Sequence, residues 1–297
     1  MKPFLKWVGG KTQLLDKINE ELPKEINNYH DIFLGGGSTL INILNSSIKI
    51  NGLVYAYDYN KNLINLYNNV KNNVELLITY IDNYINIYNS INIFNGNKKP
   101  MNDNESKSSK ESYYYYMRNR YNSIGTNNQE NIEKSALFII LNKLCFRGIY
   151  RESSLGKFNV PFGNYKTPTV YDIENLKSLS QLFQNVIFQH LDFNISLKNV
   201  KENDFVYADP PYAPENNKSF VKYNKEGFTI EDNENLFNKL KSLDNIKSKF
   251  LMSNSNVDFV KDKFNNNKYK IIIVDARRAI NSKNPESTTK EVLIKNY

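Results

Sequence analysis

The stretch DFVYADPPYAP at 204–214 places a short apolar run directly before a rigid polar turn. The run 204–208 has the length and the valine and aromatic content of a strand that is buried on both faces. Pro210 and Pro211 end it, because proline fixes φ and has no N–H to donate to a sheet ladder. Open α/β sheets bind their ligands outside the carboxyl ends of their strands, so we expect this turn to lie at a functional site.

Further apolar runs of the same kind occur on both sides of this stretch. They lie at residues 30–34, 53–57, 186–188, 250–252 and 271–274. Helical spacing follows some of them, as at Leu40, Ile41 and Leu44. Strands that alternate with helices predict an α/β fold with a mostly parallel sheet.

Residues 59–185 differ from both ends of the chain. Helical patterns cover 61–95 and the segments YYYYMRNRYN and KSALFIILNKL, whereas residues 96–112 combine Gly, Pro, Ser and charges and indicate a loop. The tyrosines at 113–116 suit a helix that packs on several sides better than a platform for stacking bases. We therefore predict one domain built from 1–58 and 186–297, with an insertion at 59–185.

The composition limits the class of protein. Lys and Arg number 39 against 31 Asp and Glu, which gives a net charge of +8 and a pI of about 9.1. This favours nucleic acid as a partner, although an AT-rich genome also enriches lysine. No run reaches the roughly 18 apolar residues of a membrane span, and no signal peptide is visible. With one cysteine, Cys145, and two histidines, we expect a cytoplasmic protein without a metal or a membrane partner.

A glycine turn follows the run 30–34. Gly35, Gly36 and Gly37 precede a helical pattern, and Asp58 ends the next strand pattern 22 residues after Gly36. An acid at about that distance accepts hydrogen bonds from a ribose in nucleotide-binding sheets. Leu40 replaces the third glycine of the dinucleotide pattern, so the turn suits a cofactor with adenosine and no diphosphate, such as S-adenosylmethionine. An ordinary tight turn with a capping acid is the structural alternative.

The run Gly9-Gly10-Lys11-Thr12 is similar to the end of an ATP-binding P-loop. A P-loop needs another glycine five residues before its second one, a strand in front and a helix behind. Leu5 occupies the position of that first glycine, and only four residues precede it. We therefore expect Lys11 to bind something other than a triphosphate.

The Asp-Pro-Pro-Tyr turn offers two hydrogen-bond acceptors beside an aromatic ring. They are the Asp209 carboxylate and the rigidly held Pro210 carbonyl, and Tyr212 supplies the ring. This set matches an exocyclic amine on a planar base. Accepting both amine protons draws the nitrogen towards tetrahedral geometry and frees its lone pair for methylation, without a covalent intermediate or a metal. The base would leave its helix and stack on the ring; a purely structural turn is the alternative.

Together these motifs resemble the Dam-type DNA adenine methyltransferases, in which the cofactor motif precedes the DPPY motif. The ordered motifs are FLKWVGGK at 4–11, DIFLGGGS at 31–38, YAYD at 55–58, FNVPFGNY at 158–165, ADPPYAP at 208–214, SNS at 253–255 and the C-terminal ARRAI and STTKEVLIKNY segments. They cover nearly the whole chain. The resemblance implies a Rossmann-like, S-adenosylmethionine-dependent methyltransferase sheet with an inserted, mainly helical target-recognition domain.

The resemblance also assigns residues. The expected catalytic residues are Asp209, Pro210 and Tyr212. The cofactor would contact Trp7, Lys11, Gly35, Gly37, Asp58, Asp192 and Asp209, with Lys11 near its methionine carboxylate. Double-stranded DNA would contact Lys6, Phe146, Arg147, Ile149, Arg151, Pro161, Tyr165, Arg277 and Arg278.

Separate roles follow for the expected DNA contacts. Phe146 would wedge into the duplex beside a flipped adenine, and Arg151 would read a guanine edge. Ile149 and Pro161 would touch bases, Lys6 would contact the outer guanine of a GATC site, and Arg277 and Arg278 would hold phosphates. Basic residues interleaved with aromatics across 141–166 also suit DNA.

Two positions depart from the family pattern. Asp31-Ile32 stand where glutamate-proline is usual, and Asp can still accept a hydrogen bond. Arg147 stands where readers of GATC commonly carry asparagine, so the target sequence is less well determined than the chemistry.

Other functions remain open on the sequence. The same fold could act on RNA or on a protein glutamine amide, although such relatives commonly carry asparagine in place of Asp209. A DNA-binding protein without catalysis is another alternative, and a P-loop ATPase is the most distant one. We expect a monomer on double-stranded DNA, with a transient dimer on DNA as the alternative.

Overall fold

The computed structural model describes residues 1–125, 131–166, 168–213, 227–277 and 288–297. The chain forms two compact units, each described by itself below. The first, here the helical unit, comprises Met1–Gly10, Gly35–Ser38 and Asn60–Gln184. The second, here the sheet unit, comprises Lys11–Leu34, Thr39–Tyr59 and Asn185–Tyr297. The helical unit thus contains two short segments from outside the predicted insertion.

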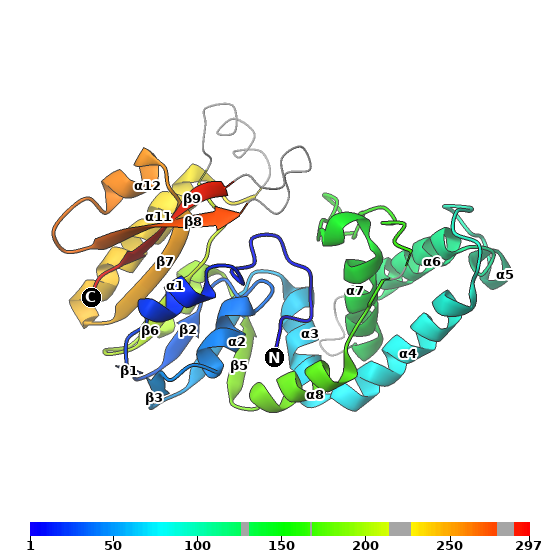
Figure 1. The fold of residues 1–297 in the computed structure, drawn as a ribbon, viewed down its shortest axis with the longest axis horizontal. Helices are drawn as coiled ribbons and strands as arrows, with labels where there is room; N and C mark the ends of the chain where they lie inside the picture. The colour runs from blue at the N-terminus through cyan, green and yellow to red at the C-terminus, as the bar shows by residue number, and fades with distance from the viewer. Residues whose placement is uncertain (126–130, 167, 214–226, 278–287) are drawn as a thin grey trace. The chain divides into compact units, whose positions relative to one another are not determined.

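The sheet unit is built on a sheet of seven strands in the order β5-β4-β2-β6-β7-β9-β8 (Figure 1). Their bounds are β2 Tyr29–Asp31, β4 Val54–Asp58, β5 Val186–His190, β6 Phe205–Ala208, β7 Lys249–Ser255, β8 Lys270–Arg277 and β9 Thr288–Lys295. The first five strands in the order are parallel, and β9 runs antiparallel to both β7 and β8. This confirms the predicted mostly parallel α/β fold. The short strands β1 (Glu25–Ile26) and β3 (Lys49–Ile50) form a separate parallel pair.

The strand order reverses between β2 and β6. From β2 the chain proceeds to β4 and then β5 on one side, and the later strands β6 and β7 lie on the other side. In doubly wound sheets the ligand crevice lies outside the carboxyl ends of the strands at this switch point. Asp31 ends β2, and Asp209 directly follows β6. The topology therefore brings these two acids to the place where a ligand is expected.

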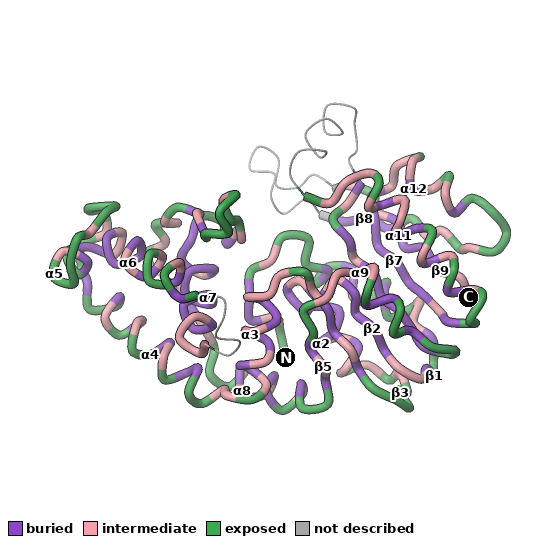
Figure 2. Tube along the Cα trace, turned by 180° about the vertical axis from the view of Figure 1, so that it is seen from behind, coloured by how far each residue is buried: buried purple, intermediate pink, exposed green. Residues whose placement is uncertain are grey.

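Helices with apolar faces cover the sheet. Their bounds are α1 Leu15–Glu20, α2 Ser38–Leu44, α9 Phe193–Ser196, α11 Ile230–Ser242 and α12 Asp258–Lys263, with 3-10 turns η2 Leu197–Asn199 and η3 Leu243–Ile246. On α11, Leu236, Phe237 and Leu240 are fully buried in one core cluster with Phe250 of β7. Figure 2 shows the buried strands at the centre of this unit. This burial of apolar area fixes the sheet that carries the site.

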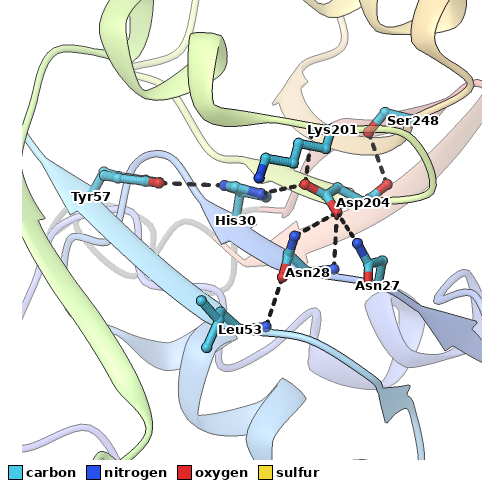
Figure 3. Close-up of polar contacts among 8 residues, drawn as sticks. All are labelled: Asn27, Asn28, His30, Leu53, Tyr57, Lys201, Asp204 and Ser248. Carbon is cyan, nitrogen blue, oxygen red and sulfur yellow. Dashed lines mark hydrogen bonds and ion pairs between the residues drawn. The ribbon is translucent and has the colours of Figure 1, made fainter.

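A buried polar network ties the amino ends of β2 and β6 together (Figure 3). The Asp204 carboxylate accepts hydrogen bonds from the backbone N–H of Asn28 at 3.0 Å, from the Asn27 amide at 3.1 Å and from His30 Nε2 at 2.9 Å. The Asp204 carbonyl accepts from Ser248 Oγ at 2.9 Å. Although burial raises the pKa of Asp204, the hydrogen bonds from His30 and from the backbone N–H groups of Lys201 and Asn28 hold it below its usual value. The network fixes strand register at the edge opposite Asp31 and Asp209.

The helical unit consists mainly of helices, as predicted. Their bounds are α3 Lys61–Asn72, α4 Val74–Ser90, α5 Asp103–Ser106, α6 Lys110–Ser123, α7 Ile132–Leu144, the 3-10 turn η1 Phe146–Gly148 and α8 Ile173–Leu182. Tyr113 and Tyr114 of α6 are buried, which confirms that the tyrosine run packs in a core.

The predicted loop at 96–112 is wrong in its second half. It contains α5 and the start of α6. The Asn102 side chain accepts from the N–H of Glu105, and the Ser109 side chain accepts from the N–H of Ser112. The polar residues that indicated a loop are therefore caps of two helices.

Candidate active site and candidate nucleic-acid face

An ion pair joins Lys11 to Asp209 in the sheet unit. Lys11 Nζ lies 2.9 Å from Asp209 Oδ1, and only 5% of the Lys11 side chain is exposed. Burial raises the pKa of Asp209 to about 6, against the lowering effect of Lys11, and the nearby Glu291 carboxylate raises it further. At neutral pH the Asp209 side chain is therefore an ionised acceptor.

Tyr212, in the same turn, is held at its hydroxyl and on its ring. Its hydroxyl donates to Glu291 Oε2 at 2.5 Å, and Lys11 Nζ lies 4.6 Å from the centre of its ring. Burial raises the pKa of Tyr212 well above its usual value, so the phenol stays neutral. The three side chains Lys11, Asp209 and Tyr212 thus form one cluster.

The backbone of the turn is bound to the end of β7. The Ala213 N–H donates to Asn254 Oδ1 at 3.1 Å, and Ser255 Oγ donates to the Ala213 carbonyl at 2.7 Å. Pro210 is buried, and in β6 the Tyr207 hydroxyl hydrogen-bonds to Ser253 Oγ at 2.8 Å. The acceptors of the turn are therefore fixed by neighbouring strands as well as by proline.

Asp31 carries a buried oxygen without a partner among the residues that the structure describes. Its Oδ2 accepts from the Tyr29 hydroxyl at 3.3 Å, whereas Oδ1 accepts from none of them. Burial raises the pKa of Asp31 to about 8, and the charges of Asp209 and Asp58 contribute to the increase. A buried carboxyl group with an unfilled acceptor oxygen and a raised pKa suits a ligand that places a positively charged hydrogen-bond donor against it.

Further carboxylates lie at the same sheet edge. Asp58 ends β4, confirming its predicted place, and Asp192 follows β5 by two residues. The Asp192 side chain also accepts from the N–H of Asn194 at 2.8 Å, at the start of α9. Since β5, β4, β2 and β6 are adjacent and parallel, Asp192, Asp58, Asp31 and Asp209 follow one edge. Such a row favours a ligand with positive charge and hydroxyl donors.

The glycine turn lies in the helical unit and needs glycine for packing. Gly35 and Gly37 have φ of +48° and +70°, in the left-handed region. A Cβ on Gly36 would lie 2.7 Å from the Cβ of Trp7, and one on Gly37 would lie 2.5 Å from the Tyr67 hydroxyl. The Tyr67 hydroxyl donates to the Gly35 carbonyl at 3.2 Å. Trp7 and Tyr67 thus exclude larger residues from the turn.

The P-loop alternative does not fit the structure. Residues 1–14 contain no strand, and α1 begins only at Leu15, after turns. Lys11 forms an ion pair with Asp209 instead of ending a phosphate-binding loop.

An exposed cluster of the helical unit brings together four residues that were predicted to contact DNA. Phe146 is 46% exposed, and the Arg147 guanidinium lies 5.1 Å from the centre of its ring. The Arg147 N–H donates to the Tyr165 hydroxyl at 2.9 Å, and Lys6 Nζ lies 4.6 Å from the Tyr165 ring. Arg147 has a φ of +57°, which is uncommon outside glycine and occurs often at functional sites.

Arg151 lies beyond this cluster in the same unit. Its Nε donates to Asn159 Oδ1 at 2.7 Å, and its terminal nitrogen donates to the Asn159 carbonyl at 3.4 Å. Pro161 is exposed, and Ile149 is half-buried. Arg277 ends β8 in the sheet unit, and Arg278 lies outside the described residues. Asn159 thus fixes the direction of a guanidinium that was predicted to read a base.

Three site residues were not predicted from the sequence. Glu291 and Asn254 bind the turn after β6, and Asn159 binds Arg151. For Glu291 a signal existed, because it is an acid directly before the fully apolar run Val292–Ile294. Asn254 and Asn159 lie within the motifs SNS at 253–255 and FNVPFGNY at 158–165, but the sequence assigned neither residue a role of its own.

The described residues contain neither a membrane-spanning helix nor a metal-binding cluster. Among the helices in that part of the chain, none is long and apolar enough to cross a membrane. Within the same residues, His, Cys, Asp and Glu side chains form no group of three or more that could hold a metal ion.

Comparisons with known proteins agree on one family. Residues 7–280 match the family model described as D12 class N6 adenine-specific DNA methyltransferase. The chain is 37% identical to a type II methyltransferase, M.MjaIII, of Methanocaldococcus jannaschii, over 100% of this chain and 99% of that protein. It is 31% identical to the type II methyltransferase M1.LlaDCHI of Lactococcus lactis, over 100% and 96%. It is 33% identical to a DNA adenine methylase of Haemophilus influenzae, over 97% and 91%.

Proposed function

Because this chain belongs to the D12 class N6 adenine-specific DNA methyltransferases, we propose that it methylates the N6 amine of an adenine flipped out of duplex DNA, within GATC. The family implies S-adenosylmethionine as the methyl donor. The ion pair between Lys11 and Asp209 is the observation that carries the chemistry, because it favours the ionised form of a largely buried carboxylate beside the Tyr212 ring.

The turn after β6 has the acceptors that amine methylation needs. The lone pair of an adenine amine is delocalised into the ring, which makes the nitrogen a poor nucleophile. In the proposal, Asp209 and the Pro210 carbonyl accept its two protons in hydrogen bonds, and Tyr212 stacks on the base. Acceptors that are fixed beforehand stabilise the transition state without reorganisation. When bound, S-adenosylmethionine supplies an electrophilic methyl group on a sulfonium.

The residues at the sheet edge fit this cofactor. Asp31 Oδ1, which has no partner within the described ranges of the chain, suits the cofactor's ammonium group, and Asp58 suits its ribose hydroxyls. The sulfonium adds a positive charge that the row of carboxylates favours. Lys11, Asp192 and Asp209 are proposed as further contacts. Trp7, Gly35 and Gly37, in the helical unit, stay predictions from the sequence.

The proposed DNA contacts lie mostly in the helical unit. Phe146 inserts between the stacked bases of the duplex beside the flipped adenine. Arg151 reads a guanine, and Lys6 contacts the outer guanine of GATC. Ile149 and Pro161 supply apolar contacts, Arg147 and Tyr165 flank the wedge, and Arg277 and Arg278 hold phosphates. Exposure supports the roles of five of them, Lys6, Phe146, Arg147, Arg151 and Pro161, and Tyr165 contacts two of these. The roles of Ile149, Arg277 and Arg278 rest on the sequence alone.

Other properties also stay proposals. Two of the relatives are named type II methyltransferases, which favours that class for this chain too. A monomeric state and a cytoplasmic location remain predictions from the sequence.

The alternatives have less support. RNA or a glutamine amide as substrate is disfavoured, because Asp209 stands where such relatives commonly carry asparagine. A DNA-binding protein without catalysis is disfavoured by the ordered acceptors of the turn.

Transfer of tritium from labelled S-adenosylmethionine tests the proposal. The acceptors are a duplex with one GATC, the same duplex with that site changed, and an RNA duplex. We expect tritium to be transferred only to the DNA duplex that contains GATC. Label in the RNA, or equal label in both DNA duplexes, would contradict the substrate or the site.

A further inference from the structure

We propose that Glu291 of β9 is a positioning residue for methyl transfer, which fixes the ring of Tyr212 in the orientation that receives the target base. The inference rests on the proposed function, in which the base stacks on Tyr212. It deepens that function by assigning a role to a strand that is far from the DPPY turn in sequence.

The contact joins the carboxylate of Glu291 to the hydroxyl of Tyr212. Glu291 lies in β9 at the register of Ser255 in β7 and Val274 in β8. From there its Oε2 accepts the Tyr212 hydroxyl at 2.5 Å. A hydrogen bond from a phenol to a carboxylate is short and strong when partly buried. It removes the freedom of the ring to tilt about its side-chain torsions.

Glu291 is an acid close to a second carboxylate. Its charge raises the pKa of Asp209, so the two carboxylates repel each other. Neither register neighbour of Glu291 is cationic, and the strand continues into the buried run Val292–Ile294. A glutamine would accept the Tyr212 hydroxyl without this repulsion, but a carboxylate is the stronger acceptor.

A second contact holds the ring of Tyr212. Lys11 Nζ lies over the ring, 4.6 Å from its centre, and also pairs with Asp209 at 2.9 Å. The ring is therefore bound at its hydroxyl by Glu291 and at its face by Lys11. In the proposal, these two contacts set the position of the ring, and of a base stacked on it, relative to Asp209. Small displacements of a reacting group lower rates strongly, so the anchor acts on the chemical step.

A double-mutant cycle tests this role. The variants are Glu291→Ala, Tyr212→Phe and the double variant, with kcat, KM for DNA, KM for S-adenosylmethionine and the melting temperature measured for each. We expect Glu291→Ala to lower kcat about tenfold, with both KM values within about twofold. In the Tyr212→Phe background the same change should alter kcat by less than about twofold, because the hydroxyl it acts through is absent.

Two further variants keep the test decisive. Glu291→Gln retains a hydrogen-bond acceptor for Tyr212 and should keep most of kcat. This variant also provides a test if Glu291→Ala fails to fold. Asp275→Asn is the matched control. It removes the charge of an exposed side chain on the neighbouring strand β8 and should leave kcat unchanged. Equal losses from Glu291→Ala in both backgrounds, or a loss that follows the melting temperature, would overturn the positioning role. If the unchanged enzyme methylates no duplex, the proposed function and this inference both fail.

Discussion

The turn after β6 and the exposed cluster around Phe146 are opposite kinds of site. In the turn, Asp209, Tyr212 and Ala213 each have a fixed partner from another segment of the sheet unit. In the cluster, Phe146 and Arg147 are exposed and Arg147 has a left-handed backbone. A transition state needs acceptors that are already in place, whereas a sequence is read by side chains that reach outward.

This difference separates chemistry from recognition. Changes in the turn should lower methyl transfer on every DNA sequence alike. Changes in the exposed cluster, and at Arg151 beyond it in the same unit, should alter which sequence is methylated. The predictions below test that separation.

The largest effect is expected from Asp209→Ala. It removes the ionised acceptor, so kcat should fall by about 10²–10³-fold or more on any substrate sequence. Single-turnover rates with saturating DNA and cofactor measure it. A variant that keeps more than a tenth of the rate would remove Asp209 from the chemistry.

A change of Arg151 should act on recognition instead. With Arg151→Ala, discrimination against a changed guanine should weaken by about 1–3 kcal/mol, while kcat on the preferred site changes less. Asn159→Ala should give a smaller effect of the same kind, because it frees the guanidinium from its two hydrogen bonds. The ratio of kcat/KM between site variants measures both. An equal loss of kcat/KM on all DNA sequences would contradict the assignment of Arg151 to recognition.

The glycine turn offers a test of stability. Gly37 and Gly156 have nearly equal φ, +70° and +68°, but only Gly37 has neighbours within 4 Å of an added Cβ. Gly156→Ala should cost about 1–2 kcal/mol of unfolding free energy from backbone strain alone. Gly37→Ala should cost more, because Tyr67 must move. Urea unfolding measures both, and equal losses would show that packing at Tyr67 is unimportant.

The smallest effect is a shift of pH dependence. Because the pKa of Asp209 is about 6, kcat/KM should fall as the pH drops through this value and Asp209 takes up a proton. Glu291→Gln removes a negative charge and should move this limb to lower pH. Lys11→Met removes a positive charge and should move it to higher pH. Shifts in the same direction would contradict the charge assignment.

The place of the Asp-Pro-Pro-Tyr turn at the end of a strand was predictable because its signals are local. A strand, two prolines and an acid lie within a few residues, and Asp58 ended its strand as expected. Glu291 was missed because its partner Tyr212 is 79 residues away in sequence. The place of β9 between β7 and β8 was also beyond local patterns, since it depends on which edge the last hairpin adds to.

Contacts between residues far apart in the sequence also decide which segments belong to the helical unit. The Lys6 N–H donates to Asn142 Oδ1 at 2.8 Å, and the Asn142 amide donates back to the Lys6 carbonyl at 2.8 Å. This pairing holds the first residues of the chain against α7, where spacing along the sequence gives no sign of it.

The most direct test of the account identifies the methylated atom. A duplex with a single GATC is methylated with labelled S-adenosylmethionine, digested to nucleosides and separated. The account predicts label only in N6-methyladenine from that site, with an initial rate of labelling lower by about 10²–10³-fold or more when Asp209→Ala replaces the unchanged enzyme at equal DNA binding. Label in cytosine, or label in adenine that Asp209→Ala leaves undiminished, would contradict it.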